Sequence, residues 1–337
     1  MPDSSIAMLD SMTAAVDAVV VLRSIFILSA ATVLFVYNVP AFRNRFLAYG
    51  ARATSDPKND PEKPASNGGE RNGGGFSAFL DYFSTLTVPR SWFTHFYVAS
   101  VASNLFWLYV IWTNSLPFRL LAESVDPARP SMDKMQIVIL QMMMALQGCR
   151  RLYECVAFRT NSDSRMWVGH YIMGMLFYLA VGVGVWIEGS PCLLGRRPEL
   201  SFAHRSWFLA AFICTGVLAI RSMWLQHKLH RYLYNLRTRP RGQANSNVAQ
   251  PKYSLPDYGP FKATFTPHYL VEMSTYGYLT FMAAPEGHWA NKTLSCALVL
   301  VVVNLGVTAI ETREWYAKRF GEEAVKDRRV FPLLGLF

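Results

Sequence analysis

The last third of the chain begins with the stretch Gln226-His227-Lys228-Leu229-His230-Arg231, which directly follows an apolar run. Basic residues continue to Arg241. Two further apolar runs then lead to Glu311-Thr312-Arg313-Glu314-Trp315-Tyr316-Ala317-Lys318-Arg319-Phe320. Cationic and aromatic side chains therefore alternate beside segments of membrane length. This pattern is typical of a polyanionic cofactor held at a membrane surface, and the alternative interpretation is a solvated basic loop between transmembrane helices.

Apolar runs of similar length recur along the 337 residues, of which 52% are hydrophobic and 17% are charged. A helix of about 20 residues crosses the hydrocarbon core of a bilayer, and only helices and closed barrels satisfy the backbone there. We predict an all-α, polytopic membrane protein with seven transmembrane helices, a cytosolic cofactor-binding loop and a C-terminal tail. The predicted spans are residues 14–39, 93–112, 135–158, 166–187, 207–225, 268–284 and 293–310.

The net charge of +10 is distributed unevenly between the two sides of this topology. The loops on one side, including 226–267 and 311–337, hold 22 Lys and Arg residues, and the loops on the other side hold seven. Cytosolic loops carry such an excess. We therefore expect a cytosolic C-terminus and a lumenal N-terminus over residues 1–13, and we do not predict nucleic-acid binding.

The cysteines and glycines exclude several kinds of site. Five cysteines show neither a CxxC motif nor a spacing with histidine that suits a metal, so we predict no disulfide framework and no metal. Gly182-Val183-Gly184 lacks the third glycine of a dinucleotide fingerprint. Any nucleotide must therefore be held by the helices and their loops. The only glycosylation sequon, Asn291-Lys292-Thr293, abuts the last span, and we expect it to be unused.

Ionisable residues inside the apolar runs are candidates for function, because they are costly in a membrane without a partner or a polar cavity. Arg150, Arg151 and Glu154 lie within five residues of one another in the third span. Arg150 and Glu154 are four residues apart and can simply pair on a helix. His95 lies early in the second span, where an interfacial histidine bonded to water is the alternative.

Four segments carry a resemblance to a known family. They are Trp92-Phe93-Thr94-His95-Phe96-Tyr97, residues 148–155, residues 255–259 with 267–272, and Trp315-Tyr316-x-Lys318-x-Phe320 with Lys326-x-Arg328-Arg329-x-x-Pro332. On these segments the chain resembles the steroid 5α-reductase family, and within it the polyprenol reductase branch. The resemblance covers about residues 88–337.

The resemblance implies seven transmembrane helices, NADPH bound from the cytosolic side, and 1,4-reduction of an enal or enone. It divides the chain into a lumenal N-terminus (1–13), a first helix (14–39), a flexible cytosolic loop (40–87) and a six-helix reductase core (88–337) with an NADPH-binding C-terminal part. His268 replaces the Asn of a family motif. The catalytic Tyr of the steroid enzymes falls near Gly148, so the acid cannot be carried over. The residues implied in cofactor binding are Gln226, His230, Arg237, Tyr316 and Arg328.

The chemistry of hydride transfer limits the choice of substrate. Hydride addition to an isolated allylic double bond leaves the developing charge without an acceptor, whereas an enal collects it on oxygen, where a hydrogen-bond donor can stabilise it. We therefore expect reduction of polyprenal, a long-chain polyisoprenoid lipid, to dolichal in the endoplasmic reticulum membrane, which supplies dolichol for protein glycosylation. Arginines suit the phosphates of NADPH.

We predict that His95, Glu154 and His268 are the catalytic residues and converge on the polar end of the lipid channel. Tyr97, Tyr269 and Glu272 are predicted to support them at the substrate. One of the catalytic residues should polarise the enal oxygen, and His95 or Glu154 is the preferred choice.

Three alternatives remain open. The same chemistry could act on a sterol enone or a very-long-chain enoyl-CoA. The Arg319-Phe320-Gly321-Glu322-Glu323 segment also resembles membrane isoprenylcysteine methyltransferases, which use S-adenosylmethionine. A non-catalytic lipid-binding membrane protein is the third alternative.

Overall fold

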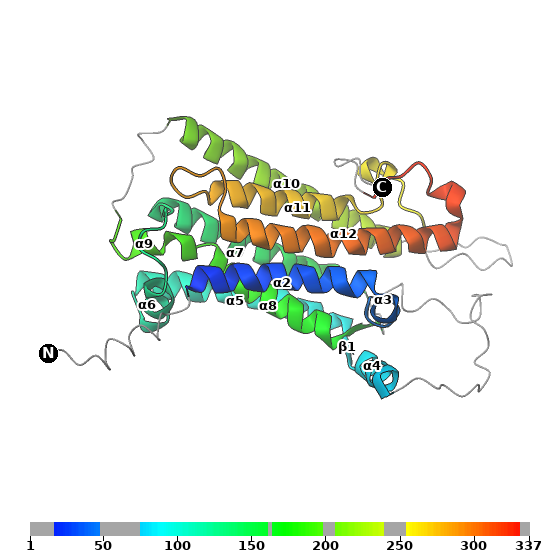
Figure 1. Ribbon diagram of the computed structural model, residues 1–337. Coiled ribbons are helices and arrows are strands. Elements are labelled where there is room, and N and C mark those ends of the chain that lie inside the picture. The colour runs from blue at the N-terminus through cyan, green and yellow to red at the C-terminus, as the bar shows by residue number, and fades with distance from the viewer. Residues whose placement is uncertain (1–16, 48–74, 161–163, 198–205, 239–253, 331–337) are drawn as a thin grey trace.

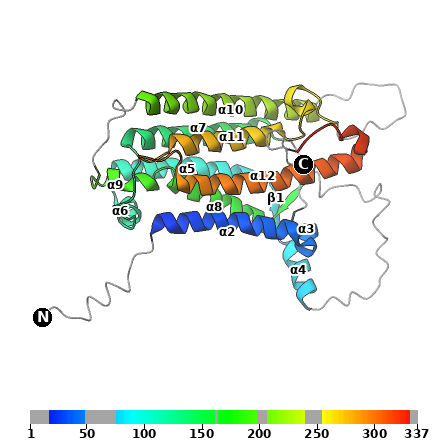
Figure 2. The same cartoon turned by 45° about the horizontal axis from the view of Figure 1, so that its top comes forward.

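The computed structural model describes residues 17–47, 75–160, 164–197, 206–238 and 254–330. Within these ranges the chain is mainly helical, and its long helices run roughly along one common axis (Figure 1). Figure 2 shows the same bundle turned by 45° about the horizontal axis. The predicted lumenal segment 1–13 lies outside the described residues. The long helices are α2 (Ala18–Asn38), α5 (Phe93–Trp112), α7 (Lys134–Ala157), α8 (Val168–Gly184), α10 (Ser206–Thr238), α11 (Pro267–Met282) and α12 (Lys292–Phe320).

Short elements connect these helices. The short α-helices are α3 (Pro40–Phe46), α4 (Gly75–Thr85), α6 (Leu116–Glu123) and α9 (Ser190–Leu193), and the 3₁₀ turns are η2 (Arg90–Trp92), η3 (Ile187–Gly189), η5 (Gly259–Lys262) and η6 (Glu322–Ala324). The predicted loop 40–87 thus includes the helices α3 and α4, while residues 48–74 lie outside the described part of the chain.

All seven predicted apolar runs are helical, but only some of these helices are both long and apolar enough to cross a membrane. Helices α2 and α12 and the ranges Val168–Leu193 and Phe208–Thr238 pass on length and composition, and α5 passes together with α6 as a pair bent by 87°. Helix α11 has 16 residues, and α7 carries buried glutamines and charged residues. Four or five candidate spans are therefore supported, and the count of seven is not confirmed.

A two-stranded antiparallel ribbon, which the sequence analysis did not predict, ties the beginning of α5 to the beginning of α8. Strand β1 (Thr87–Pro89) pairs with β2 (Arg165–Trp167), with Val88 opposite Met166. Each strand has only three residues. That length is too short for an alternating pattern to be recognised in a sequence.

The first part of the basic segment that the sequence analysis interpreted as a loop, residues 226–238, is helical instead. Helix α10 continues through it to Thr238, and α12 includes the aromatic and basic run up to Phe320. No Pro or Gly interrupts residues 217–238, so nothing in this stretch ends the helix before Pro240. As a consequence, Gln226, His230 and Arg237 recur at helical spacing and are held on one rigid element.

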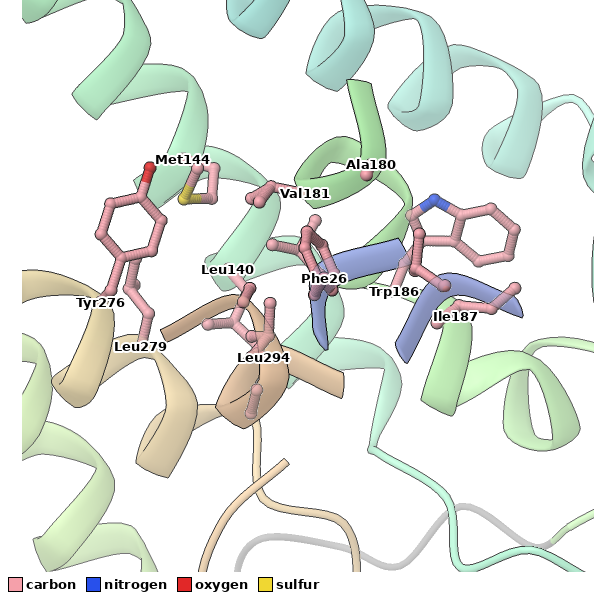
Figure 3. Packing of buried hydrophobic residues seen from close by; sticks show 14 of the residues in the cluster. Phe26, Leu140, Met144, Ala180, Val181, Trp186, Ile187, Tyr276, Leu279 and Leu294 are labelled. Carbon is pink, nitrogen blue, oxygen red and sulfur yellow. The ribbon is translucent and has the colours of Figure 1, made fainter. Parts of the chain in front are cut away.

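The apolar core lies between α2, α7, α8, α11 and α12. Figure 3 shows Phe26 of α2 close to Val181 of α8 and Leu140 of α7. Phe26 and Trp186 are both fully buried. Large side chains from five helices thus hold the bundle together by burial of apolar surface.

A cluster of hydrogen-bonded polar side chains lies at one end of this core. Arg23 Nη2 donates to Glu188 Oε1 at 2.8 Å, and the backbone N–H of Thr293 donates to the same oxygen at 2.7 Å. Asn291 caps α12 by accepting from the Leu294 N–H at 2.9 Å, and it is fully buried. The charge of Arg23 inside the first predicted span is therefore paired, as a buried cation requires.

Candidate active site

A buried carboxylate near the end of α7 is the centre of the polar site. Glu154 is 3% exposed and contacts four side chains. Its Oε2 accepts from Arg151 Nη1 at 2.5 Å and lies 2.7 Å from His230 Nδ1. Its Oε1 accepts from Arg150 and lies 3.0 Å from His227 Nδ1. An ionised carboxylate is acceptor-only, so Glu154 acts as the anchor of these donors.

Gln226 joins the carboxylate site to α11. It is fully buried, and its Nε2 donates to Glu272 Oε2 at 2.9 Å. Its Oε1 accepts from Arg150 and, at 3.4 Å, from Gln147 Nε2. Both ends of the Gln226 amide are therefore engaged, and the amide fixes the positions of Arg150 and Glu272 relative to each other.

Arg151 extends the network to Tyr97 on α5. Its Nη2 donates to Tyr97 Oη at 2.5 Å, and its Cζ lies 4.8 Å from the centroid of the Tyr97 ring. Tyr97 is 5% exposed, and its ring packs edge-on against Tyr178 with centroids 5.5 Å apart. Because the Tyr97 oxygen accepts from a cation, its own proton is available for donation, and the cation would stabilise negative charge on that oxygen.

Two histidines extend the network to the N-terminal end of α11. The ring centroid of His230 lies 5.3 Å from that of His268, which in turn lies 4.3 Å from the ring of Tyr269. His230 Nδ1 is also 2.8 Å from Arg151 Nη1. It can accept from Arg151 or donate to Glu154, but one tautomer cannot do both.

Two buried nitrogen atoms of this site have no hydrogen-bond partner among the described residues, namely Arg151 Nε and His268 Nδ1. Most buried polar atoms are hydrogen-bonded, and each exception needs an explanation. These two atoms belong to the same chain of contacts through His230. A polar ligand that enters here would satisfy them.

A cationic and aromatic platform lies next to this chain. The Tyr316 ring stacks on Phe265 with centroids 5.2 Å apart, and Arg328 Cζ lies 5.4 Å from the Phe265 centroid. Arg237 and Arg328 lie near enough to Tyr316 for their charges to influence its hydroxyl, and Arg237 is also near His268. Arg237 therefore lies between the platform and the histidines.

The platform is supported by two segments that are far apart in the sequence. The Arg329 N–H donates to the Ala263 carbonyl at 3.0 Å, and Thr264 Oγ1 donates to the Val330 carbonyl at 3.0 Å. The chain leaves α12 at Gly321, whose φ of 86° and ψ of 153° fall in a region that essentially only glycine adopts. Gly321 therefore allows the turn that brings Arg328 back to Phe265.

Comparison with known proteins agrees with this arrangement. Residues 195–333 match the family described as 3-oxo-5-alpha-steroid 4-dehydrogenase. This part of the chain is therefore similar to the steroid 5α-reductase family. A Caenorhabditis elegans protein named polyprenal reductase is 25% identical over 260 residues, which are 73% of this chain and 79% of the relative. The human polyprenal reductase is 25% identical over 263 residues, 73% of this chain and 78% of the relative.

A further relative, an uncharacterised protein of Schizosaccharomyces pombe, is 32% identical over 207 residues, 60% of this chain and 64% of the relative. The resemblance that the sequence predicted is confirmed, and with it the class of enzyme: an oxidoreductase that acts on a carbon–carbon double bond. The family match begins at residue 195. It includes the platform and the histidines, whereas Tyr97, Arg151 and Glu154 lie in the part of the chain before it.

The structure brings most of the predicted site residues together within the helical bundle, and it leaves one apart. Glu154, Tyr97, His268, Tyr269 and Glu272 join the network around Gln226, His230 and Arg237, with Tyr316 and Arg328 on the adjoining platform. His95 is exposed, and its Nδ1 lies 3.2 Å from Tyr171 Oη. Residues two positions apart on a helix point in different directions, so His95 does not follow Tyr97 into the network.

The sequence analysis assigned no site role to His227 and Gln147, and it named Arg151 only as one of the clustered ionisable residues of the third span. Gln147, Arg150, Arg151 and Glu154 recur at spacings of three, four and seven residues from the first. This is the spacing of one face of a helix. A search for polar faces on apolar helices would have found the whole set, whereas the pair Arg150 and Glu154 accounts for only half of it.

Proposed function

We propose that this protein reduces the double bond in the α-isoprene unit of polyprenal to give dolichal, with NADPH as the hydride source. The relatives named polyprenal reductase support the substrate. The observation that carries the proposal is the buried chain of contacts from Tyr97 through Arg151 and His230 to His268. It provides a hydroxyl proton, a fixed cation and an unsatisfied histidine in a bundle that is otherwise apolar.

The residues of the platform fit the proposed cofactor. Arg237 and Arg328 would hold phosphates of NADPH, since a guanidinium is permanently charged and binds phosphate in a bidentate manner. Tyr316 offers a flat aromatic ring. Gln226 and His230 would line the site from α10, where their contacts to Glu272 and Glu154 orient them. NADPH, when bound, supplies the hydride.

The acid that polarises the enal oxygen is proposed to be Tyr97. The hydroxyl is buried, its oxygen is held by Arg151, and its proton remains free for the substrate carbonyl. Glu154 accepts from two arginines, so in our proposal it holds Arg151 in place and does not donate. The proton that the α carbon requires would come from water, with neutral His268 taking up a proton at one ring nitrogen and giving one up from the other, because its Nδ1 has no partner in the described structure.

The cellular setting is part of the proposal. All seven long helices would lie in the endoplasmic reticulum membrane, with α7 and α11 packed against more apolar helices. The excess of Lys and Arg in the segments that follow α10 and α12 supports a cytosolic C-terminus. Similarity to this family favours a reductase over the methyltransferase alternative, and a sterol enone or an enoyl-CoA remains the competing substrate.

The decisive experiment compares Tyr97→Phe with Tyr109→Phe in the purified full chain. Tyr109 lies on the same helix and is 62% exposed, so its variant is a matched control. With polyprenal and NADPH, Tyr97→Phe should lower kcat by roughly 10²-fold or more, as expected for loss of a donor to the developing oxyanion. NADPH affinity should stay near the wild-type value.

Unchanged turnover in Tyr97→Phe would remove Tyr97 from the chemistry. In that case, His95→Ala and Glu154→Gln decide between the two acids that the sequence favoured. If the enzyme reduced a sterol enone or an enoyl-CoA in preference to polyprenal, the proposed type of reaction would stand, but the proposed substrate would be wrong.

A further inference from the structure

Helix α4 is fastened to its neighbours along one side. Its inner face carries Leu80, which is 6% exposed, and Asp81, whose carboxylate accepts from Arg45 Nε at 2.8 Å. Trp167 Nε1 in the ribbon donates to the Phe83 carbonyl at 2.9 Å. These contacts come from α3 and from β2, so the orientation of α4 on the bundle is defined.

The opposite side of α4 is aromatic and exposed. Phe76, Phe79 and Tyr82 are 66%, 53% and 64% exposed, and Phe83 packs its ring against Phe79 with centroids 4.5 Å apart. Phe76, Phe79 and Phe83 recur at the spacing of one helix face. A contiguous group of exposed aromatic side chains marks an interaction surface more often than a solvated one.

The position of α4 indicates what covers this surface. The helix lies at one end of the bundle beside α3, as both Figure 1 and Figure 2 show. In the sequence, α4 lies between α2, which ends at Asn38, and α5, which begins at Phe93. With 11 residues it is about 16 Å long, roughly half the thickness of a hydrocarbon core. It cannot cross a membrane, but it lies at the same level as the C-terminal end of α2 and the N-terminal end of α5, where these two helices would leave one.

Aromatic side chains connect α4 to the outer surface of α2. Phe35 is 55% exposed on α2, and its ring meets Phe42 of α3 at 5.2 Å. Phe42 meets Phe46 at 5.9 Å, and Phe46 meets Trp167 of the ribbon at 4.4 Å. Aromatic residues of this kind gather at the interface between lipid and water. A series of aromatic contacts thus runs from the exposed Phe35 of α2, through the buried Phe46, to Trp167, which donates to α4.

We propose that the aromatic face of α4 docks on the bilayer interface of the membrane that holds the long helices, with Phe76, Phe79 and Tyr82 inserted at the level of the headgroups. The partner is a phospholipid surface, recognised by insertion of apolar side chains. Asp81, the one charged residue of α4, is paired on the inner face, so the docking does not depend on lipid charge. The proposal is independent of the reductase activity.

The test places a photoreactive benzoylphenylalanine at Phe79 or at Tyr82 in the full chain, reconstituted in nanodiscs of phosphatidylcholine. The control position is Glu323, whose side chain is 86% exposed at the end of α12. After irradiation, mass spectrometry should detect phospholipid adducts at Phe79 and Tyr82 and none at Glu323. Adding phosphatidylserine should leave the adduct yield unchanged.

Three outcomes would overturn the proposal. Crosslinks between two copies at Phe79 or Tyr82 would make the face a protein interface. Absence of lipid adducts at both positions, as at Glu323, would make it a solvated face. Adducts that form only with phosphatidylserine would show that charge, and not apolar insertion, recruits the helix.

Discussion

Replacement of Glu154 by Gln tests whether the polar site depends on a single anion. The substitution keeps the size and shape of the side chain and removes its charge. Glu154 is 3% exposed at the side chain, and its partners Arg150 and Arg151 are 14% and 16% exposed. Loss of one partner from a buried ion pair costs roughly 3–5 kcal/mol, because the remaining charge is left without compensation. We expect Glu154→Gln to lower the free energy of unfolding by that amount.

A surface pair provides the control. Arg43 contacts Glu311 and Glu314, with side-chain exposures of 30%, 17% and 41%. Pairs of this kind are worth about 0–1 kcal/mol, so Arg43→Gln should change stability little. Reversible unfolding of the full chain in mixed micelles measures both variants under the same conditions.

The double variant Glu154→Gln, Arg151→Gln separates the ion pair from other effects of the substitution. Once Glu154 has lost its charge, removal of the Arg151 charge should cost less than it does in the wild type, with a coupling of roughly 0.5–3 kcal/mol. A loss in Glu154→Gln no larger than in Arg43→Gln, or additive effects in the double variant, would refute the view that Glu154 anchors the site.

Three further predictions concern the cofactor, the topology and the sequon. Arg237→Ala should raise the KM for NADPH by roughly tenfold or more, because a charged hydrogen bond is worth about 1.5–3 kcal/mol. Arg231→Ala, on the same helix, is the control. Equal KM values in the two variants would exclude Arg237 from the cofactor site. Reporter tags should place the C-terminus in the cytosol and residues 1–13 in the lumen, and tags on one side would contradict an odd number of spans. Asn291 should carry no glycan, because it is fully buried as the cap of α12; an endoglycosidase shift that Asn291→Gln abolishes would contradict this.

The helical runs were predictable from composition because the physics that produces them is local. Each apolar run near 20 residues is helical in the structure, since a chain in lipid must satisfy its own backbone. The predicted ends of the helices were less accurate where charged residues follow an apolar run. The basic run after Leu225 reads as a loop by composition, yet α10 continues to Thr238, since charged residues such as Lys228 and Arg231 are good helix formers.

The site was predictable in part. Tyr97, Glu154, His230 and His268 each stand out as polar groups in apolar surroundings, but their grouping depends on how α5, α7, α10 and α11 pack. His95 stands out by the same criterion, and only the packing separates it from Tyr97, because it turns toward Tyr171. The ribbon of β1 and β2 depends on pairing between strands far apart in the sequence, such as Val88 with Met166, that no local pattern indicates.

Helices α10 and α12 are the two longest helices of the described chain, and both are much longer than the hydrocarbon core of a membrane is thick. With 33 and 29 residues, α10 and α12 reach about 50 Å and 44 Å, against about 30 Å of hydrocarbon. Arg237 lies one residue from the end of α10 and Tyr316 lies in the last turns of α12, so both stand on the part of each helix that exceeds the bilayer. In the proposed function, these ends would hold the platform outside the lipid, where a hydrophilic dinucleotide could bind and leave. Tyr97 and Glu154, on the shorter α5 and α7, would then lie closer to the lipid, within reach of an isoprenoid chain.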